Sequence, residues 1–129
     1  MNRGFVSGWV ACVSGHAHES LSPPHTVEVA DGVFAYVQPD GSWWLNNTGF
    51  VRGPDAVVAI DATSTERRTR ALLSAIATAC ASPTRVLVNT HHHGDHTNGN
   101  CLLPDATVIG HHLCRDEVMQ ARIGGVGGL

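Results

Sequence analysis

The sequence predicts an α/β (α+β) fold in which a mixed, mostly antiparallel sheet carries flanking helices. Residues 26–37 alternate between apolar and polar side chains around a tight turn, as antiparallel strands do. The continuous apolar run 56–60 is typical of a strand buried on both faces, and residues 85–89, with an apolar centre, predict another buried strand. Residues 63–81 have helical spacing between these two predicted strands, which indicates a strand–helix–strand crossover.

The first part of the predicted sheet is a meander. Strands at 26–30 and 33–37 are joined by Asp31-Gly32, a dipeptide that favours a two-residue hairpin turn. Residues 43–51 continue the sheet after a second turn, and the apolar run that follows them completes the meander.

The second part of the predicted fold begins with a helix. Thr63 and Glu66 match the spacing of a capping box, and apolar residues at helical spacing follow, so we expect a helix over 63–81. Residues 106–109 predict a short strand, and 112–123 predict a last helix.

The chain has 129 residues, enough for one domain. We divide it into a leader of low order or weak signal-like character (1–24), a folded domain (25–123) and a flexible glycine-rich tail (124–129).

Charge and hydropathy exclude two classes of partner. Eight basic against eleven acidic residues give a net charge of −3 with neutral histidine, which excludes a strongly basic nucleic-acid binder. No apolar run reaches the ~18 residues that cross a bilayer, so we expect no membrane partner. Four cysteines without a C-x-x-C pair indicate reduced thiols in a cytoplasmic protein, although the signal-like start leaves secretion open.

The segment 91–96 holds four histidines and one aspartate directly after a buried strand. Residues i and i+2 leaving a strand point the same way, so His91 and His93 are placed to bind one metal ion. Asp95 and His96 face the same space from the other side. Neutral imidazole and carboxylate are ligands that Zn²⁺ accepts, and Fe or Mn²⁺ accept them too. The sequence therefore predicts a site for one or two metal ions.

These residues spell H-x-H-x-D-H, and Asp61 ends the apolar strand that precedes the predicted helix. Both features resemble the metallo-β-lactamase superfamily of metal-dependent hydrolases. The resemblance implies that His91 and His93 bind a first metal ion and that Asp95 and His96 bind a second. It also implies that Asp95 orients the attacking hydroxide as a catalytic residue, and that Asp61 buttresses the site without binding metal.

The resemblance further implies an αββα sandwich of two similar halves, with the site at one edge between them. The family's later ligands, two histidines and a bridging aspartate, belong to the second half, and this sequence matches the N-terminal half only. We therefore expect 25–123 to be a partial domain of this kind. A homodimer, or a complementing C-terminal half, would supply the missing ligands.

Two functions remain open at this point. The first is hydrolysis of an ester, thioester, lactone or lactam-type bond in a small-molecule substrate, through metal-bound hydroxide. The alternative is a non-catalytic half-domain that binds metal weakly or not at all.

For four nearby residues we expect a role other than metal binding, or none. His92 is expected to be exposed or locally hydrogen-bonded, and Cys101 to pack in the core. Because successive side chains of a strand point to opposite faces, we expect one ring of the Trp43-Trp44 pair to be buried. That pair is consistent with either packing or substrate contact.

Overall fold

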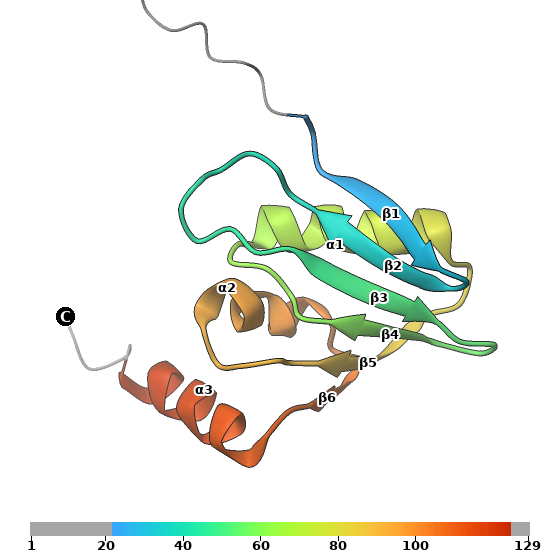
Figure 1. Cartoon of the computed structure of the whole chain (residues 1–129). Coiled ribbons are helices and arrows are strands. Elements are labelled where there is room, and N and C mark those ends of the chain that lie inside the picture. Colours follow the sequence, from blue (N-terminus) through green and yellow to red (C-terminus); the bar gives the residue numbers. More distant parts are fainter. Residues whose placement is uncertain (1–21, 125–129) are drawn as a thin grey trace, which may run out of the picture.

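The computed structural model describes residues 22–124 of the chain (Figure 1). The predicted leader and glycine-rich tail lie almost entirely outside this range. Among the described residues, no helix combines the length and the apolar character needed to cross a membrane.

One six-stranded sheet organises the fold, and its strands lie side by side in the order in which they occur in the sequence (Figure 1). The first four strands pair antiparallel, and the last two are added in parallel. This confirms the mixed, mostly antiparallel sheet. The strands are β1 (His25–Ala30), β2 (Val33–Val37), β3 (Thr48–Arg52), β4 (Val57–Ile60), β5 (Thr84–Val88) and β6 (Thr107–Ile109).

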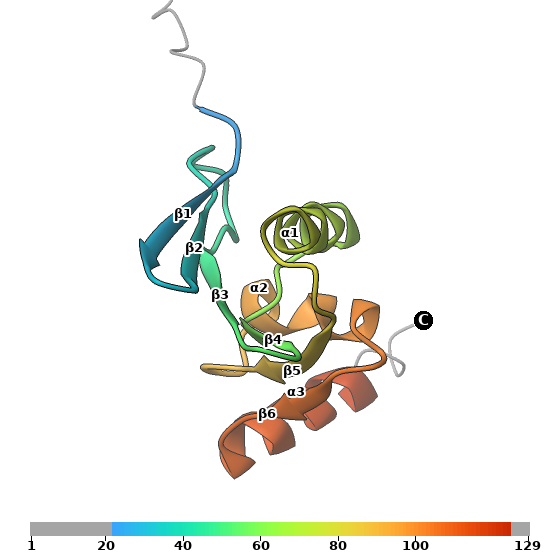
Figure 2. The ribbon, with the colours of Figure 1, turned by 90° about the vertical axis from the view of Figure 1, so that its right-hand side faces the viewer.

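Helices follow the last three strands. Figure 2 shows α1 and the α2–η1 segment on the same side of the sheet, with α3 beyond β6. After β5, residues 90–93 form no helix or strand, and the chain becomes helical from Gly94 on. The helices are α1 (Glu66–Ala79), α2 (Gly94–Thr97), the 3₁₀ helix η1 (Asn98–Leu102) and α3 (His112–Gly124).

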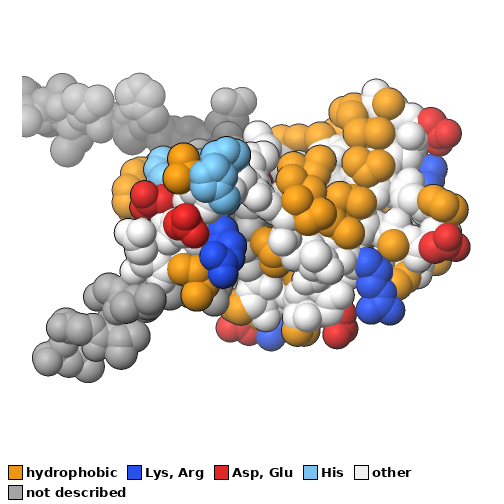
Figure 3. Space-filling model, turned by 90° about the horizontal axis from the view of Figure 1, so that it is seen from below, with side chains coloured by type: hydrophobic (Ala, Val, Ile, Leu, Met, Phe, Trp, Pro, Cys, Tyr) orange, Lys and Arg blue, Asp and Glu red, His pale blue; other side chains and the backbone are white. Residues whose placement is uncertain are grey.

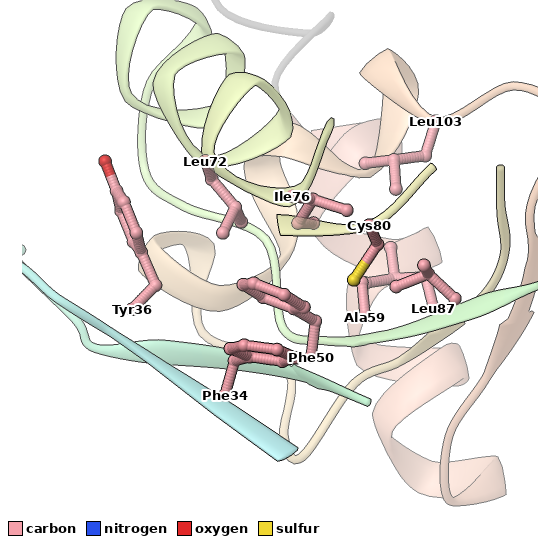
Figure 4. Packing of buried hydrophobic residues seen from close by; sticks show 10 residues of the cluster. Phe34, Tyr36, Phe50, Ala59, Leu72, Ile76, Cys80, Leu87 and Leu103 are labelled. Carbon is pink, nitrogen blue, oxygen red and sulfur yellow. The ribbon is translucent and has the colours of Figure 1, made fainter. Parts of the chain in front are cut away.

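The hydrophobic core lies between the sheet and α1 (Figure 4). Phe50 on β3 is fully buried and stacks on Phe34 of β2, with ring centroids 4.7 Å apart. Leu72 and Ile76 of α1 project onto the same face of the sheet, because residues four apart lie on one side of a helix. Cys80, at the end of α1, is also buried and belongs to this core.

The opposite face of the sheet, which we call the outer face, is also apolar. Strand alternation places half-buried side chains there, and no helix among residues 22–124 lies over them (Figure 2). Figure 3 shows hydrophobic side chains gathered on this part of the surface. The outer-face residues are Val33, Ala35, Val37, Val51, Val58, Ile60, Val86 and Val88.

Two local predictions were wrong. Residues 43–47 form no strand, because the backbone turns at Trp44, whose φ is 60°. The first residue of the capping box was also misplaced. The N-cap of α1 is Thr65, whose hydroxyl accepts a hydrogen bond from the Arg68 amide, whereas Thr63 is buried and its hydroxyl contacts that of Thr69 at 2.7 Å.

Helix α1 packs closely against η1 at Gly99. A Cβ added there would clash with Thr69 Oγ1 and would lie 2.9 Å from Cγ2 and 3.0 Å from Cβ, so no rotation of Thr69 removes the clash. We expect Gly99→Ala to lower the free energy of unfolding by about 1–3 kcal/mol, the usual cost of overpacking. Urea unfolding followed by circular dichroism measures this. Gly110→Ala is the control, because a Cβ there meets its nearest atom at 3.5 Å.

Candidate metal centre

The candidate site lies where the parallel strands β4 and β5 end. Ile60 and Val88 are paired at these ends, and the Asp61 amide donates to the Val88 carbonyl at 2.8 Å. The next residues of both strands therefore emerge side by side. Helix α2 is attached at the same place, because the Ala62 amide donates to the His96 carbonyl at 2.9 Å. Ligand sites in α/β sheets commonly occupy this edge.

Asp61 is the acceptor around which the site is built. Its side chain is buried, and its φ of 61° is a conformation that aspartate tolerates better than most residues. The carboxylate accepts hydrogen bonds from the Thr90 amide at 2.8 Å and the Thr90 hydroxyl at 2.7 Å. Nδ1 of His96 lies 2.8 Å from the same carboxylate and donates to it.

These hydrogen bonds fix which nitrogen of each imidazole carries the proton. Because His96 donates from Nδ1 to Asp61, its Nε2 keeps a free lone pair. Thr90 gives its only hydroxyl proton to Asp61, so His91 Nδ1, 3.0 Å from the Thr90 oxygen, must be the donor of that contact. Nε2 of His91 is therefore also free to bind a metal ion.

The four predicted ligands, His91, His93, Asp95 and His96, lie together, and we call them the histidine–aspartate cluster. The ring centroid of His91 is 4.0 Å from that of His96 and 4.8 Å from that of His93. His96 Nε2 lies 3.4 Å from an Asp95 carboxylate oxygen. Within residues 22–124, however, no three histidine, cysteine, aspartate or glutamate side chains form a ready metal-binding group. The imidazole and carboxylate groups are of the kinds that zinc binds, but three of them do not yet converge on one point.

The surroundings of His91 favour its neutral imidazole form. Burial lowers the pKa of His91 from its ordinary value, and the nearby His96 and His93 lower it further. A lowered pKa means that the ring gives up its second proton more readily, so the lone pair on Nε2 is available at neutral pH.

The structure tests the expectations for four neighbouring residues. His92 is exposed, as expected. Cys101 was expected in the core but is exposed, with its thiol donating to the Asn98 carbonyl at 3.6 Å. Trp43 and Trp44 are 87% and 45% exposed, so the expectation that one ring is buried was wrong, because no strand forms there.

Residues that support His96 were missed by the sequence analysis. Asn100 donates to the Asn89 side-chain oxygen at 2.7 Å, and Asn89 in turn donates to the His96 carbonyl at 3.2 Å. Together with the Ala62 amide, this pair holds the backbone of His96 in place. The available signal was a polar residue, Asn89, at the end of a buried strand.

Comparison with known proteins gives the context of this arrangement. The model of the metallo-beta-lactamase superfamily matches residues 41–127, more than half of the chain. The chain belongs to the metallo-beta-lactamase superfamily. No match was found among curated proteins.

Solved structures of the superfamily share the fold. A metallo-beta-lactamase from Pontibacter korlensis matches 77% of this chain with 19% identity and a TM-score of 0.68, over 48% of its own length. FIM-1 from Pseudomonas aeruginosa, in its mono-zinc form, matches 81% with 17% identity and a TM-score of 0.66, over 49% of its length. A metallo-beta-lactamase from Hirschia baltica matches 78% with 18% identity and a TM-score of 0.65, over 49% of its length.

This superfamily member therefore spans about half the length of the solved structures that it matches. The predicted N-terminal half of the fold is confirmed. The ligand roles of the histidine–aspartate cluster and the buttressing role of Asp61 stay predictions.

Proposed function

We propose that the chain carries the N-terminal part of the active site of a metal-dependent hydrolase, acting on an ester, thioester, lactone or lactam-type bond. The observation that carries the proposal is the hydrogen bonding of Asp61 and Thr90, which leaves Nε2 of His91 and of His96 free within one cluster. Membership of the superfamily supports the same reading.

The cluster residues would hold one or two zinc ions, and Fe or Mn²⁺ would suit the same donors. When bound, zinc supplies a Lewis acid that polarises a carbonyl group and lowers the pKa of bound water. Asp95 would accept a hydrogen bond from the attacking water and orient it, and Asp61 would keep His96 in its binding tautomer.

The substrate proposed is a small molecule with an apolar group. Trp43 and Trp44 stack on each other, with ring centroids 5.4 Å apart; Trp43 is largely exposed and Trp44 about half exposed. A Cβ on Gly94, the first residue of α2, would lie 2.8 Å from Trp44 Cζ3, so the indole packs directly against the turn that carries Asp95. These rings offer an apolar wall beside the cluster. A net charge of −3 also favours a small-molecule substrate over nucleic acid.

The remaining metal ligands would come from a complementing C-terminal half, with a homodimer as the second candidate. The apolar outer face supports this part of the proposal, because a second layer seated there would bring its own side chains to the same sheet edge. A cytoplasmic location is supported by the free thiols of Cys80, Cys101 and Cys114.

Zinc binding is the direct test, using competition between the purified 129-residue chain and a chromophoric chelator. A catalytic zinc usually has three protein ligands, so an open site with fewer should bind weakly. We expect measurable binding that falls at least about ten-fold in His91→Ala and His93→Ala, because each variant removes one ligand. His112→Ala, an exposed histidine at the start of α3, is the control.

The chain alone should be a poor hydrolase, because an open site positions the attacking water badly. We expect no turnover of generic ester, thioester or lactam substrates above that of free zinc. Turnover that disappears in His93→Ala would instead mean that this half suffices, and sedimentation would then decide whether a dimer forms. Zinc affinity that is the same in all variants would contradict the metal centre and favour the non-catalytic alternative.

A further inference from the structure

Residues 38–47, here called the tryptophan loop, join β2 to β3 and carry Trp43 and Trp44 at their exposed tip. The loop has no strand pairing of its own. A segment of ten residues without pairing is ordinarily mobile unless side chains hold it. The contacts of this loop therefore decide whether its indole rings have a fixed place beside the cluster.

The base of the loop is held by amide side chains. The side chain of Gln38 donates from Nε2 to the Asn46 carbonyl at 2.7 Å, and the backbone amide of Gln38 donates to Asn47 Oδ1 at 2.9 Å. Asn46 donates to the carbonyl of Ala62 at 2.9 Å. These bonds close the two ends of the loop on each other and on the residue after Asp61, but none of them reaches the tip.

The first half of the tryptophan loop, residues 38–42, is held by the side chain of Arg68 on α1. Arg68 donates to Gln38 Oε1 at 3.0 Å, to Asp40 Oδ2 at 2.7 Å and to Ser42 Oγ at 2.9 Å. The last of these contacts is one residue before the tryptophan pair. One planar guanidinium thus joins three loop positions, a geometry that a lysine ammonium does not reproduce.

Arg68 is itself well anchored. Its backbone amide donates to the N-cap hydroxyl of Thr65, so the first turn of α1 fixes the origin of the side chain. The hydroxyl and amide of Ser42, and then Arg68, lower the pKa of Asp40 to about 2, so the acidic partner stays charged throughout the neutral range. The contact between the Arg68 guanidinium and the charged Asp40 carboxylate is therefore present at neutral pH.

We propose that Arg68 is a positioning residue, which holds the tryptophan loop so that Trp43 and Trp44 form a fixed wall beside the histidine–aspartate cluster. This role for the wall rests on the proposed function. The fixing of the loop does not, because it depends only on contacts within this chain. The surface that the proposed substrate meets is then formed before binding.

Hydrogen exchange measured by mass spectrometry tests this in the full chain without metal. In Arg68→Met, which keeps the side-chain stem and removes the donors, we expect amides of 38–47 to exchange about ten-fold faster, the effect of losing at least one net hydrogen bond. Arg68→Lys should lie between this variant and the native chain. Amides of β4 and α1 should exchange within two-fold of the native rate. Fluorescence anisotropy in a Trp9→Phe background should fall, because the two remaining tryptophans gain mobility.

The matched control is Arg70→Met. Arg70 lies on the same helix, and among the described residues its side chain hydrogen-bonds only to Glu66, at 2.8 Å. In Arg70→Met, the amides of the tryptophan loop should exchange at the rate of the native chain. Unchanged loop exchange in Arg68→Met would overturn the proposal, as would an equal rise across the whole sheet, which would make Arg68 a general stability residue. Because none of these measurements uses metal or substrate, their failure is distinct from failure of the proposed hydrolase.

Discussion

Phe50→Ala is expected to lower the free energy of unfolding by about 3–5 kcal/mol. Phe50 is fully buried between the middle of the sheet and α1, and its ring stacks on that of Phe34 with an interplanar angle of 13°. The truncation removes this contact and leaves a cavity that the surrounding strands cannot fill. A small domain has a total free energy of unfolding of only about 5–15 kcal/mol. The variant should therefore be largely unfolded, or folded with little stability left.

Urea unfolding followed by far-ultraviolet circular dichroism measures this loss. Val51→Ala is the matched control, because Val51 is the next residue of the same strand but points to the outer face, where it is half-buried. We expect that control to cost no more than about 1 kcal/mol. A cost for Val51→Ala equal to that of Phe50→Ala would mean that the outer face is covered in solution.

Asp61→Asn is expected to weaken zinc binding by about 10–100-fold while leaving the fold intact. The amide oxygen can still accept the hydrogen bond from the Thr90 amide. The amide nitrogen, however, presents hydrogens to His96 Nδ1, which must then accept instead of donating. The imidazole proton moves to Nε2, the nitrogen that would otherwise bind the metal.

Chelator competition gives the affinity, and the nitrogen shifts of His96 in nuclear magnetic resonance give the tautomer. Asp105→Asn is the control, since Asp105 is exposed and its replacement removes the same charge. A tautomer that switches without any loss of zinc affinity would show that His96 is not a ligand.

The sequence was most informative where a local pattern of residues is compatible with only one secondary structure. Alternation around Asp31-Gly32 predicts β1 and β2, and the structure has both strands joined at this turn. The apolar run that ends at Asp61 predicts β4, and Asp61 does emerge beside the histidines. These features depend on residues close to each other in the chain, so their patterns can be read without knowing the rest of the fold.

The remaining features depend on distant contacts. Residues 43–47 have the composition of a strand, but Trp44 turns at a positive φ and packs against Gly94, which the local sequence does not encode. Both Thr63 and Thr65 are acceptable N-caps, and the choice depends on the contact of Thr63 with Thr69. Thr90 and Asn89 acquire their roles only when β5 lies beside β4.

The order of strands in the sheet has a consequence for synthesis. Because neighbours in space are neighbours in sequence, each strand meets its partner in the segment that left the ribosome just before it. Only 35 residues separate Asp61 from His96, so the ring closure that builds the site is short. A nascent chain can therefore assemble this layer strand by strand, and the apolar side chains of its outer face lie on the surface as soon as β2 to β5 have paired.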